Sequence, residues 1–134
     1  MMRSSHRQDF SLHLLRIGVA GLFMAHAATR IANGTIPLFA HFLAERGWPY
    51  SLTLVWLITA YELAAGVCLI AGKWIGWVTA GYAFIVSMGI VIIHFQNGWW
   101  VGEHGTGGME YSVLLLLALL VIGSAGRRTR LLMY

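Results

Sequence analysis

Residues 52–71 read LTLVWLITAYELAAGVCLIA, an apolar run of 20 residues in which Glu62 is the only charged side chain. A helix of about 20 apolar residues is long enough to cross the ~30 Å hydrocarbon core of a bilayer. Three further apolar runs lie at residues 11–29, 74–95 and 109–125. The sequence therefore predicts an all-α, integral membrane four-helix bundle that forms a single domain over residues 1–134.

The composition excludes an ordinary soluble domain. Hydrophobic residues make up 58% of the chain and charged residues 10%, against about 45–50% and 25% in soluble proteins. The 16 glycines suit close helix packing in lipid. The formal charge of +4 indicates membrane orientation and not nucleic-acid binding, because the basic residues lie beside apolar runs at the chain ends. The single cysteine, Cys68, excludes dithiol chemistry within one chain.

The first apolar run is the weakest of the four, because His13 and Arg16 lie in its opening turns. Arg16 would have to extend along the helix to the membrane surface. The basic N-terminus, the short apolar stretch and residues 25–27 (Ala-His-Ala) also resemble a cleavable signal peptide. We favour the intact helix.

The distribution of Lys and Arg predicts the orientation. Four crossings would place seven of the nine basic residues on one side: Arg3, Arg7, Arg16, Lys73, Arg127, Arg128 and Arg130. Because positive residues favour the cytoplasm, both termini are expected inside, with connections 30–51 and 96–108 outside. No mitochondrial transit peptide or endoplasmic retention tail is visible. A multi-pass protein of the bacterial cytoplasmic (inner) membrane is predicted.

The first outer connection is expected to contain a short helix. Pro37 can open it, and Gly47-Trp48-Pro49 closes it. An apolar face formed by Leu38, Phe39, Phe42 and Leu43 predicts a surface or re-entrant helix packed on the mouth of the bundle. The second outer connection, 97–108, contains five glycines and should be irregular.

Ionisable residues at membrane depth suggest a site. A charge at the bilayer centre costs roughly 2.5–3.5 kcal/mol on insertion scales, so Glu62 should be protonated or paired. His26 and Arg30 lie four residues apart on one helix face, from which Arg30 can reach a carboxylate. His94 and Glu110 end and begin the next two helices at the same level. These groups predict one outer-leaflet cavity, with Ser87 on its wall and Glu103 and His104 on the loop above.

Two other interpretations of these residues remain open. Buried polar groups often act as hydrogen-bonding contacts between membrane helices, each contributing under about 1 kcal/mol. Alternatively, His26 and His94 are axial ligands of a haem, or a histidine and carboxylates hold a transition metal. No His-x-x-x-His or cysteine motif supports metal binding, so no metal site is predicted.

The order of these residues resembles the DoxX-like family of small four-helix membrane proteins, which includes the small subunit of an archaeal thiosulfate:quinone oxidoreductase. The resemblance rests on motifs spread over most of the chain: Arg16-Ile17, Phe23-Met24-Ala25-His26, Arg30, Tyr61 to Gly66, Ala71-Gly72-Lys73, His94, Asn97 to Trp100, and Gly107 to Tyr111. The chain departs from the family at Ala27, where glycine commonly follows the histidine. The resemblance implies a link to quinone, sulfur or oxidative-stress metabolism.

Together, residues and resemblance suggest a redox-linked subunit that binds a quinone-like apolar ligand. His26, Arg30 and His94 would donate hydrogen bonds to the quinone, and Glu62 and Glu110 would form its catalytic proton path. Aromatic walls are expected from Phe23, Trp56, Tyr61 and Phe84. The chain shows no flavin, iron–sulfur or dithiol motif, so a partner protein subunit or a homo-oligomer is expected, and catalysis by the chain alone is not. The alternatives are a non-catalytic assembly or docking protein and a small-solute conduit.

Overall fold

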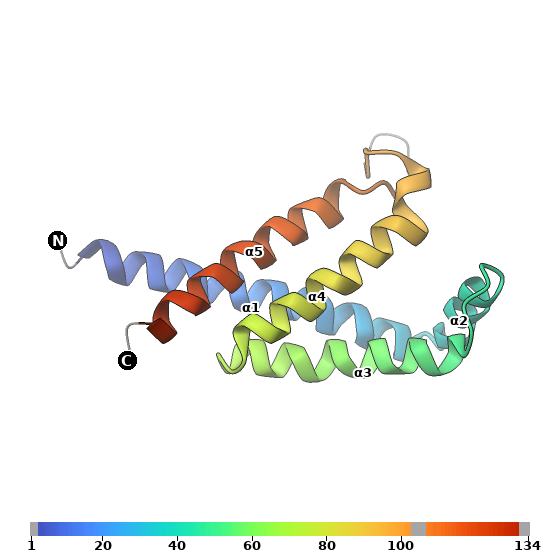
Figure 1. The fold of residues 1–134 in the computed structure, drawn as a ribbon, viewed down its shortest axis with the longest axis horizontal. Helices are drawn as coiled ribbons and strands as arrows, with labels where there is room; N and C mark the ends of the chain where they lie inside the picture. The colour runs from blue at the N-terminus through green and yellow to red at the C-terminus, as the bar shows by residue number, and fades with distance from the viewer. Residues whose placement is uncertain (1–2, 103–106, 132–134) are drawn as a thin grey trace.

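The computed structural model describes the backbone of residues 3–102 and 107–131, and the side chains of residues 8–102 and 107–126. The described residues form helices and no strand (Figure 1). The α-helices are α1 (Arg3–Ala32), α2 (Ile36–Ala44), α3 (Ser51–Ile70), α4 (Ile75–Gly89) and α5 (Glu110–Leu131). α4 continues into a π-helix, η1 (Ile90–His94), and a 3₁₀ turn, η2 (Phe95–Asn97).

Three helical segments are long and apolar enough to cross a membrane, namely Gln8–Ala32, Ser51–Ile70 and Ile75–Asn97. α3 matches the predicted run 52–71 within one residue at each end. The apolar part of α5 within the described side chains, Glu110–Gly126, is shorter. The all-α membrane fold is thus confirmed, whereas a fourth crossing at 109–125 stays a prediction.

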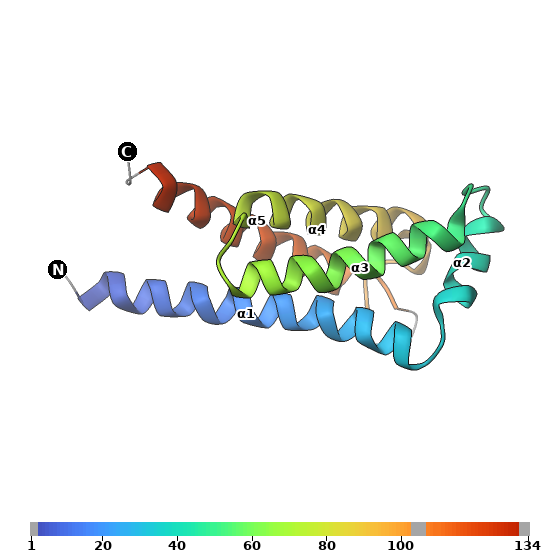
Figure 2. The ribbon, with the colours of Figure 1, turned by 90° about the horizontal axis from the view of Figure 1, so that it is seen from below.

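The long helices form two antiparallel pairs. α1 packs beside α3, and α4 packs beside α5 (Figures 1 and 2). The start of α1 and the end of α5 lie at the same end of the molecule as the α3–α4 turn, and α2 lies at the other end. Figure 1 shows the two pairs diverging toward the α2 end.

The apolar core draws on α1, α3, α4 and α5. Tyr82, Leu69 and Leu119 are its largest fully buried apolar residues. The ring of Tyr82 stacks on Phe23 of α1 at 3.9 Å between centroids, and Tyr61 of α3 meets it edge-on at 5.7 Å. These contacts hold the two helix pairs together in the half of the molecule away from α2.

α1 and α3 each end in a turn of the same type. After α1, the N–H of Thr35 donates to the carbonyl of Arg30 and the N–H of Gly34 to that of Ile31. This pair of backbone hydrogen bonds is the Schellman motif, in which a residue at positive φ closes the helix. Gly34 has a φ of 61°, and Gly72 closes α3 with a φ of 73°.

The side chain of Arg16 stays within the protein at the C-terminus of α3. Its Nη2 donates to the carbonyl of Ile70 at 3.5 Å, where a cation is also favoured by the helix dipole. Arg16 therefore has one partner at a helix end, while its Nε is buried without a hydrogen-bond partner among the described residues.

The predicted short helix of the first outer connection is present as α2, with Pro37 in its first turn. Its buried residues Ile36, Ala40 and Leu43 pack on Val55 of α3. Leu38, which the sequence places on the same apolar face, is 73% exposed and lies outside the face that packs on α3. α2 thus covers the first turns of α3, and the face of α2 that packs there is formed by Ile36, Ala40 and Leu43 (Figure 2).

Candidate functional site

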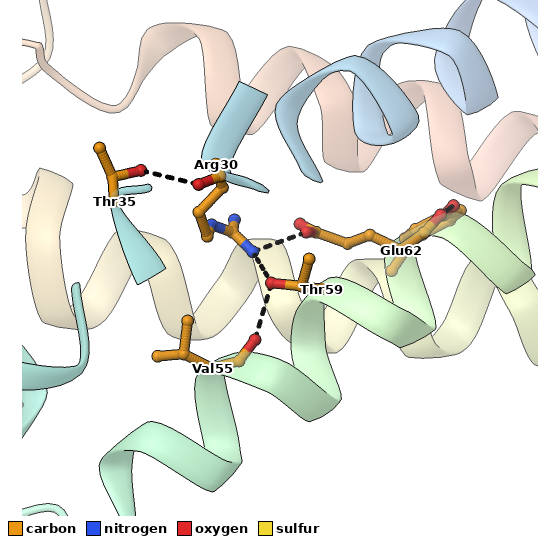
Figure 3. Close-up of polar contacts among 6 residues, drawn as sticks. Arg30, Thr35, Val55, Thr59 and Glu62 are labelled. Atoms are coloured by element: carbon orange, nitrogen blue, oxygen red, sulfur yellow. Dashed lines mark hydrogen bonds and ion pairs between the residues drawn. The ribbon is translucent and has the colours of Figure 1, made fainter. Parts of the chain in front are cut away.

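Arg30 and Glu62 form a buried ion pair between α1 and α3. Nη1 of Arg30 lies 3.0 Å from Oε2 of Glu62, and the two side chains are 9% and 2% exposed. The same Nη1 donates to Oγ1 of Thr59 at 2.7 Å, while Thr59 donates to the carbonyl of Val55 (Figure 3). The prediction that Glu62 has a charged partner, and that Arg30 can reach it, agrees with this geometry.

Local structure fixes both partners. The carbonyl of Arg30 accepts hydrogen bonds from the N–H and the hydroxyl of Thr35, so the turn after α1 holds the Arg30 backbone (Figure 3). The guanidinium lies 5.5 Å from the ring centre of Phe39 on α2. The hydroxyl of Tyr82 on α4 donates to the backbone carbonyl of Glu62 on α3 at 2.6 Å. Elements α1, α2, α3 and α4 thus all position the pair.

A cavity of about 420 Å³ lies against this ion pair, between the two diverging helix pairs. Four of the five predicted site residues line it: His26, Arg30, Glu62 and His94. Phe23 and Phe84 line it as expected, but Trp56 and Tyr61 do not. Trp56 is 50% exposed, and the hydroxyl of Tyr61 donates to the carbonyl of Val78. Most of the remaining wall is aliphatic, so the cavity is apolar with a few polar groups.

His94 is positioned by the π-helix and by the second outer connection. Its Nδ1 lies 2.8 Å from the carbonyl of Gly107. Because a carbonyl only accepts, Nδ1 must carry the proton, which leaves Nε2 as an acceptor when the ring is neutral. A π-helix, which is frequent at functional sites, was not predicted from the sequence.

Glu110 does not line the cavity. Its side chain is exposed, and Oε2 accepts a hydrogen bond of 3.4 Å from the backbone N–H of Val101. Its predicted catalytic role therefore stays a prediction. Ser87 is exposed and likewise does not line the cavity. Glu103 and His104 lie outside the described residues.

Sequence reasoning missed three polar residues near the site. Thr59 lies three residues before Glu62 and so on the same helix face, a spacing that could have revealed it. Ser112 and Tyr111 line the cavity from the first turn of α5, but no sequence signal separates them from an ordinary helix start. Both were found only because α5 packs across the cavity.

Among the described residues, no three His, Cys, Asp or Glu side chains lie close enough together to hold a metal ion. The described residues therefore offer no ligand set for the alternative of a histidine–carboxylate metal centre. His26 and His94 line the same cavity, so haem coordination by these two residues stays an untested alternative.

The DoxX family model matches residues 11–95 of the chain. The chain belongs to the DoxX family. No curated protein and no solved structure matches it. The DoxX match includes His26, Arg30, Glu62 and His94, the four predicted site residues that line the cavity, and excludes Glu110. The family resemblance seen in the sequence is confirmed.

Proposed function

We propose that this DoxX-family chain is a redox-linked membrane subunit that binds a quinone-like apolar ligand in the 420 Å³ cavity. The observation that carries the proposal is the Arg30–Glu62 ion pair at the polar end of an otherwise apolar cavity. Ligand sites in proteins are commonly cavities of this volume, with a mostly apolar wall and a few convergent polar groups.

The cost of the ion pair favours a site over a purely structural contact. Each charge carries a penalty of roughly 2.5–3.5 kcal/mol at the bilayer centre, while an interhelical hydrogen bond returns under about 1 kcal/mol. A hydrogen bond between two neutral side chains could link the helices without the cost of burying any charge. A charged pair that lines a cavity is therefore better explained by a ligand that uses it.

Arg30 keeps donors available for such a ligand. Its hydrogen bonds to other described residues use only Nη1, which leaves Nη2 and Nε free to donate toward a carbonyl oxygen. Nε2 of His94 can accept from a hydroxyl. A quinone supplies carbonyls that become hydroxyls when two electrons and two protons are added, so both kinds of group find a partner here.

Protons for this change would be held close to the ligand by Glu62 and His26, which line the same cavity. Glu62 is the predicted proton acceptor, and Arg30 stabilises its charged form at 3.0 Å. Glu110 was predicted to share this role, but its contact with Val101 keeps it outside the set of cavity residues.

The proposal includes four membrane crossings, a bacterial inner-membrane location and cytoplasmic termini. The joint position of the start of α1, the α3–α4 turn and the end of α5 supports that orientation, because these segments carry most of the Lys and Arg residues. A partner subunit, or a second copy of the chain, would supply the electron-transfer group that the sequence lacks.

The test removes both charges of the pair together. The double variant Arg30→Gln, Glu62→Gln removes both charges together and keeps a polar side chain at each position, so it should fold while losing ligand binding. Purified protein in mild detergent is titrated with a short-chain ubiquinone, and binding is followed by the quench of tryptophan fluorescence and by the quinone ultraviolet spectrum. We expect at least a tenfold loss of affinity relative to the wild type.

The matched control replaces the exposed polar pair at the end of α2, where Nδ1 of His41 lies 3.6 Å from Oε1 of Glu45. His41→Gln, Glu45→Gln should bind quinone like the wild type. Equal quinone affinity in the wild type and in the Arg30, Glu62 double variant contradicts the proposal and favours the assembly protein. Haem absorption bands in the purified protein would instead make His26 and His94 the ligands of interest, and solute flux into vesicles would favour a conduit.

A further inference from the structure

A second cavity of about 390 Å³ adjoins the first between α1 and the start of α5. Its wall is more polar than that of the first cavity, because five of its seven lining residues have polar side chains: His26, Thr29, Arg30, Thr35 and Tyr111. Four residues, including His26 and Arg30, line both cavities and so form the partition between them. An apolar cavity and a more polar one therefore meet at the side chains of His26 and Arg30.

Two of the three hydroxyl groups that line the second cavity need solvent as a hydrogen-bond partner. Those of Thr29 and Tyr111 form no hydrogen bond within the described part of the chain, although both residues line the cavity. A hydroxyl without a partner in an apolar medium costs several kcal/mol. The volume far exceeds the ~10–15 Å³ that one water molecule requires.

The backbone beside this cavity points to the same conclusion. α1 ends at Ala32, and Arg30 near that end is bonded to Thr59, which lies about 12 Å along α3 from Ser51. In both ribbon views α1 stops before the outer end of α3 (Figures 1 and 2). The irregular turn 33–35 thus lies within the length of a membrane-spanning helix. Such backbone is tolerated only where protein buries it or water reaches it.

We propose that the second cavity is an aqueous vestibule, entered from the side of the membrane on which α2 lies, through which water and protons reach His26 and Arg30. The apolar cavity then receives the hydrophobic ligand. Protons enter and leave through the vestibule and do not pass through the apolar cavity. The proton role rests on the proposed quinone function, whereas the presence of water does not.

The test measures access to cysteines placed on α1. Cys68→Ala removes the native thiol, and single cysteines then replace Ala25, Ala28 or Thr29. All three positions are exposed on α1, but Ala25 and Thr29 line the vestibule, whereas Ala28 lines neither cavity. Ala25 lies about 4.5 Å deeper along α1 than Ala28. Membrane vesicles of both orientations are treated with a charged, membrane-impermeant maleimide, and His41→Cys on the exposed surface of α2 identifies the α2 side.

We expect Ala25→Cys to react at least tenfold faster than Ala28→Cys from the side on which His41→Cys reacts, despite its greater depth. Thr29→Cys should also react faster than Ala28→Cys, and it carries the test if Ala25→Cys does not fold. Reaction of Ala28→Cys at an equal or higher rate, or reaction of the vestibule cysteines only from the opposite side, would overturn the vestibule. Because no ligand is present, a failed vestibule and a failed quinone site give separate results.

Discussion

Arg30 and Glu62 carry opposite charges on facing turns of α1 and α3, and each is nearly closed off from solvent. Removal of one charge leaves the other buried without compensation, which typically costs 3–5 kcal/mol, whereas removal of both is often close to neutral. The pair is therefore a unit whose two members should be changed together if binding is to be separated from folding.

At this scale we predict that Glu62→Gln alone lowers the free energy of unfolding by about 3–5 kcal/mol. Unfolding is measured by titration of the detergent-solubilised protein with sodium dodecyl sulfate, followed by tryptophan fluorescence. The Arg30→Gln, Glu62→Gln variant should recover most of the loss. The His41→Gln, Glu45→Gln control should stay within about 1 kcal/mol of the wild type, as is usual for exposed pairs. A double variant no more stable than Glu62→Gln would contradict this account of the pair.

Helices α3 and α4 approach closely at Gly81. A methyl group added there would overlap the hydroxyl of Tyr61, which is anchored by its hydrogen bond to the carbonyl of Val78. Tyr61 also packs edge-on against Tyr82, whose hydroxyl holds the backbone of Glu62. The packing of these two helices is thus connected to the position of the site.

We predict that Gly81→Ala destabilises the protein by about 1–3 kcal/mol, the usual effect of overpacking a close contact. The same unfolding titration measures it. Gly76→Ala is the matched control, because Gly76 lies on the same helix with open space around it, and alanine there should be neutral or slightly stabilising. An equal loss in both variants would show that the contact with Tyr61 does not decide the effect.

The π-helix η1 determines the direction in which His94 points. A π-helical segment arises from one residue inserted into an α-helix, so removal of one residue restores regular bonding and rotates everything after it by about 100°. Val91 is the suitable residue to delete, because its side chain is 66% exposed and lines neither cavity.

Deletion of Val91 should leave the helical circular dichroism unchanged while reducing quinone affinity at least tenfold, because His94 leaves the cavity and its contact with Gly107 is lost. A Val91→Ala variant keeps the residue count and should bind quinone normally. If the deletion binds quinone as well as Val91→Ala does, the π-helix is not what positions the site.

At the scale of the whole molecule, the start of α1, the end of α5 and the α3–α4 turn lie at the same end, opposite α2. This arrangement needs an even number of crossings, so it depends on whether α5 returns through the bilayer with its shorter apolar part. The core contacts of Leu119 and Ile122 with the other helices favour that return.

We predict that a green fluorescent protein fused after residue 134 fluoresces, because it folds in the cytoplasm and not after export through the general secretory route. Alkaline phosphatase fused after Asn97 should be active, since this enzyme needs the oxidising exterior. An inactive phosphatase at Asn97 together with an active one after residue 134 would reverse the orientation.

The sequence by itself determined the membrane class, the three long apolar helices and the short helix at Pro37, because apolar length and turn residues act locally. It also identified Glu62 as a charge that needs a partner, since the cost of a buried carboxylate is the same in any arrangement. Helical spacing also offered Arg30 as a group able to reach a carboxylate, and the ion pair agrees with that. Only the tertiary structure decided that Thr59 joins the pair, and that Glu110 and Trp56 lie outside the cavity. The spacing of residues fixes which face of a helix they share. Which neighbour contacts that face depends on the rotation of each helix, on the close contact at Gly81 and on the π-helix η1 that ends at His94. All three are set by packing between segments far apart in the chain.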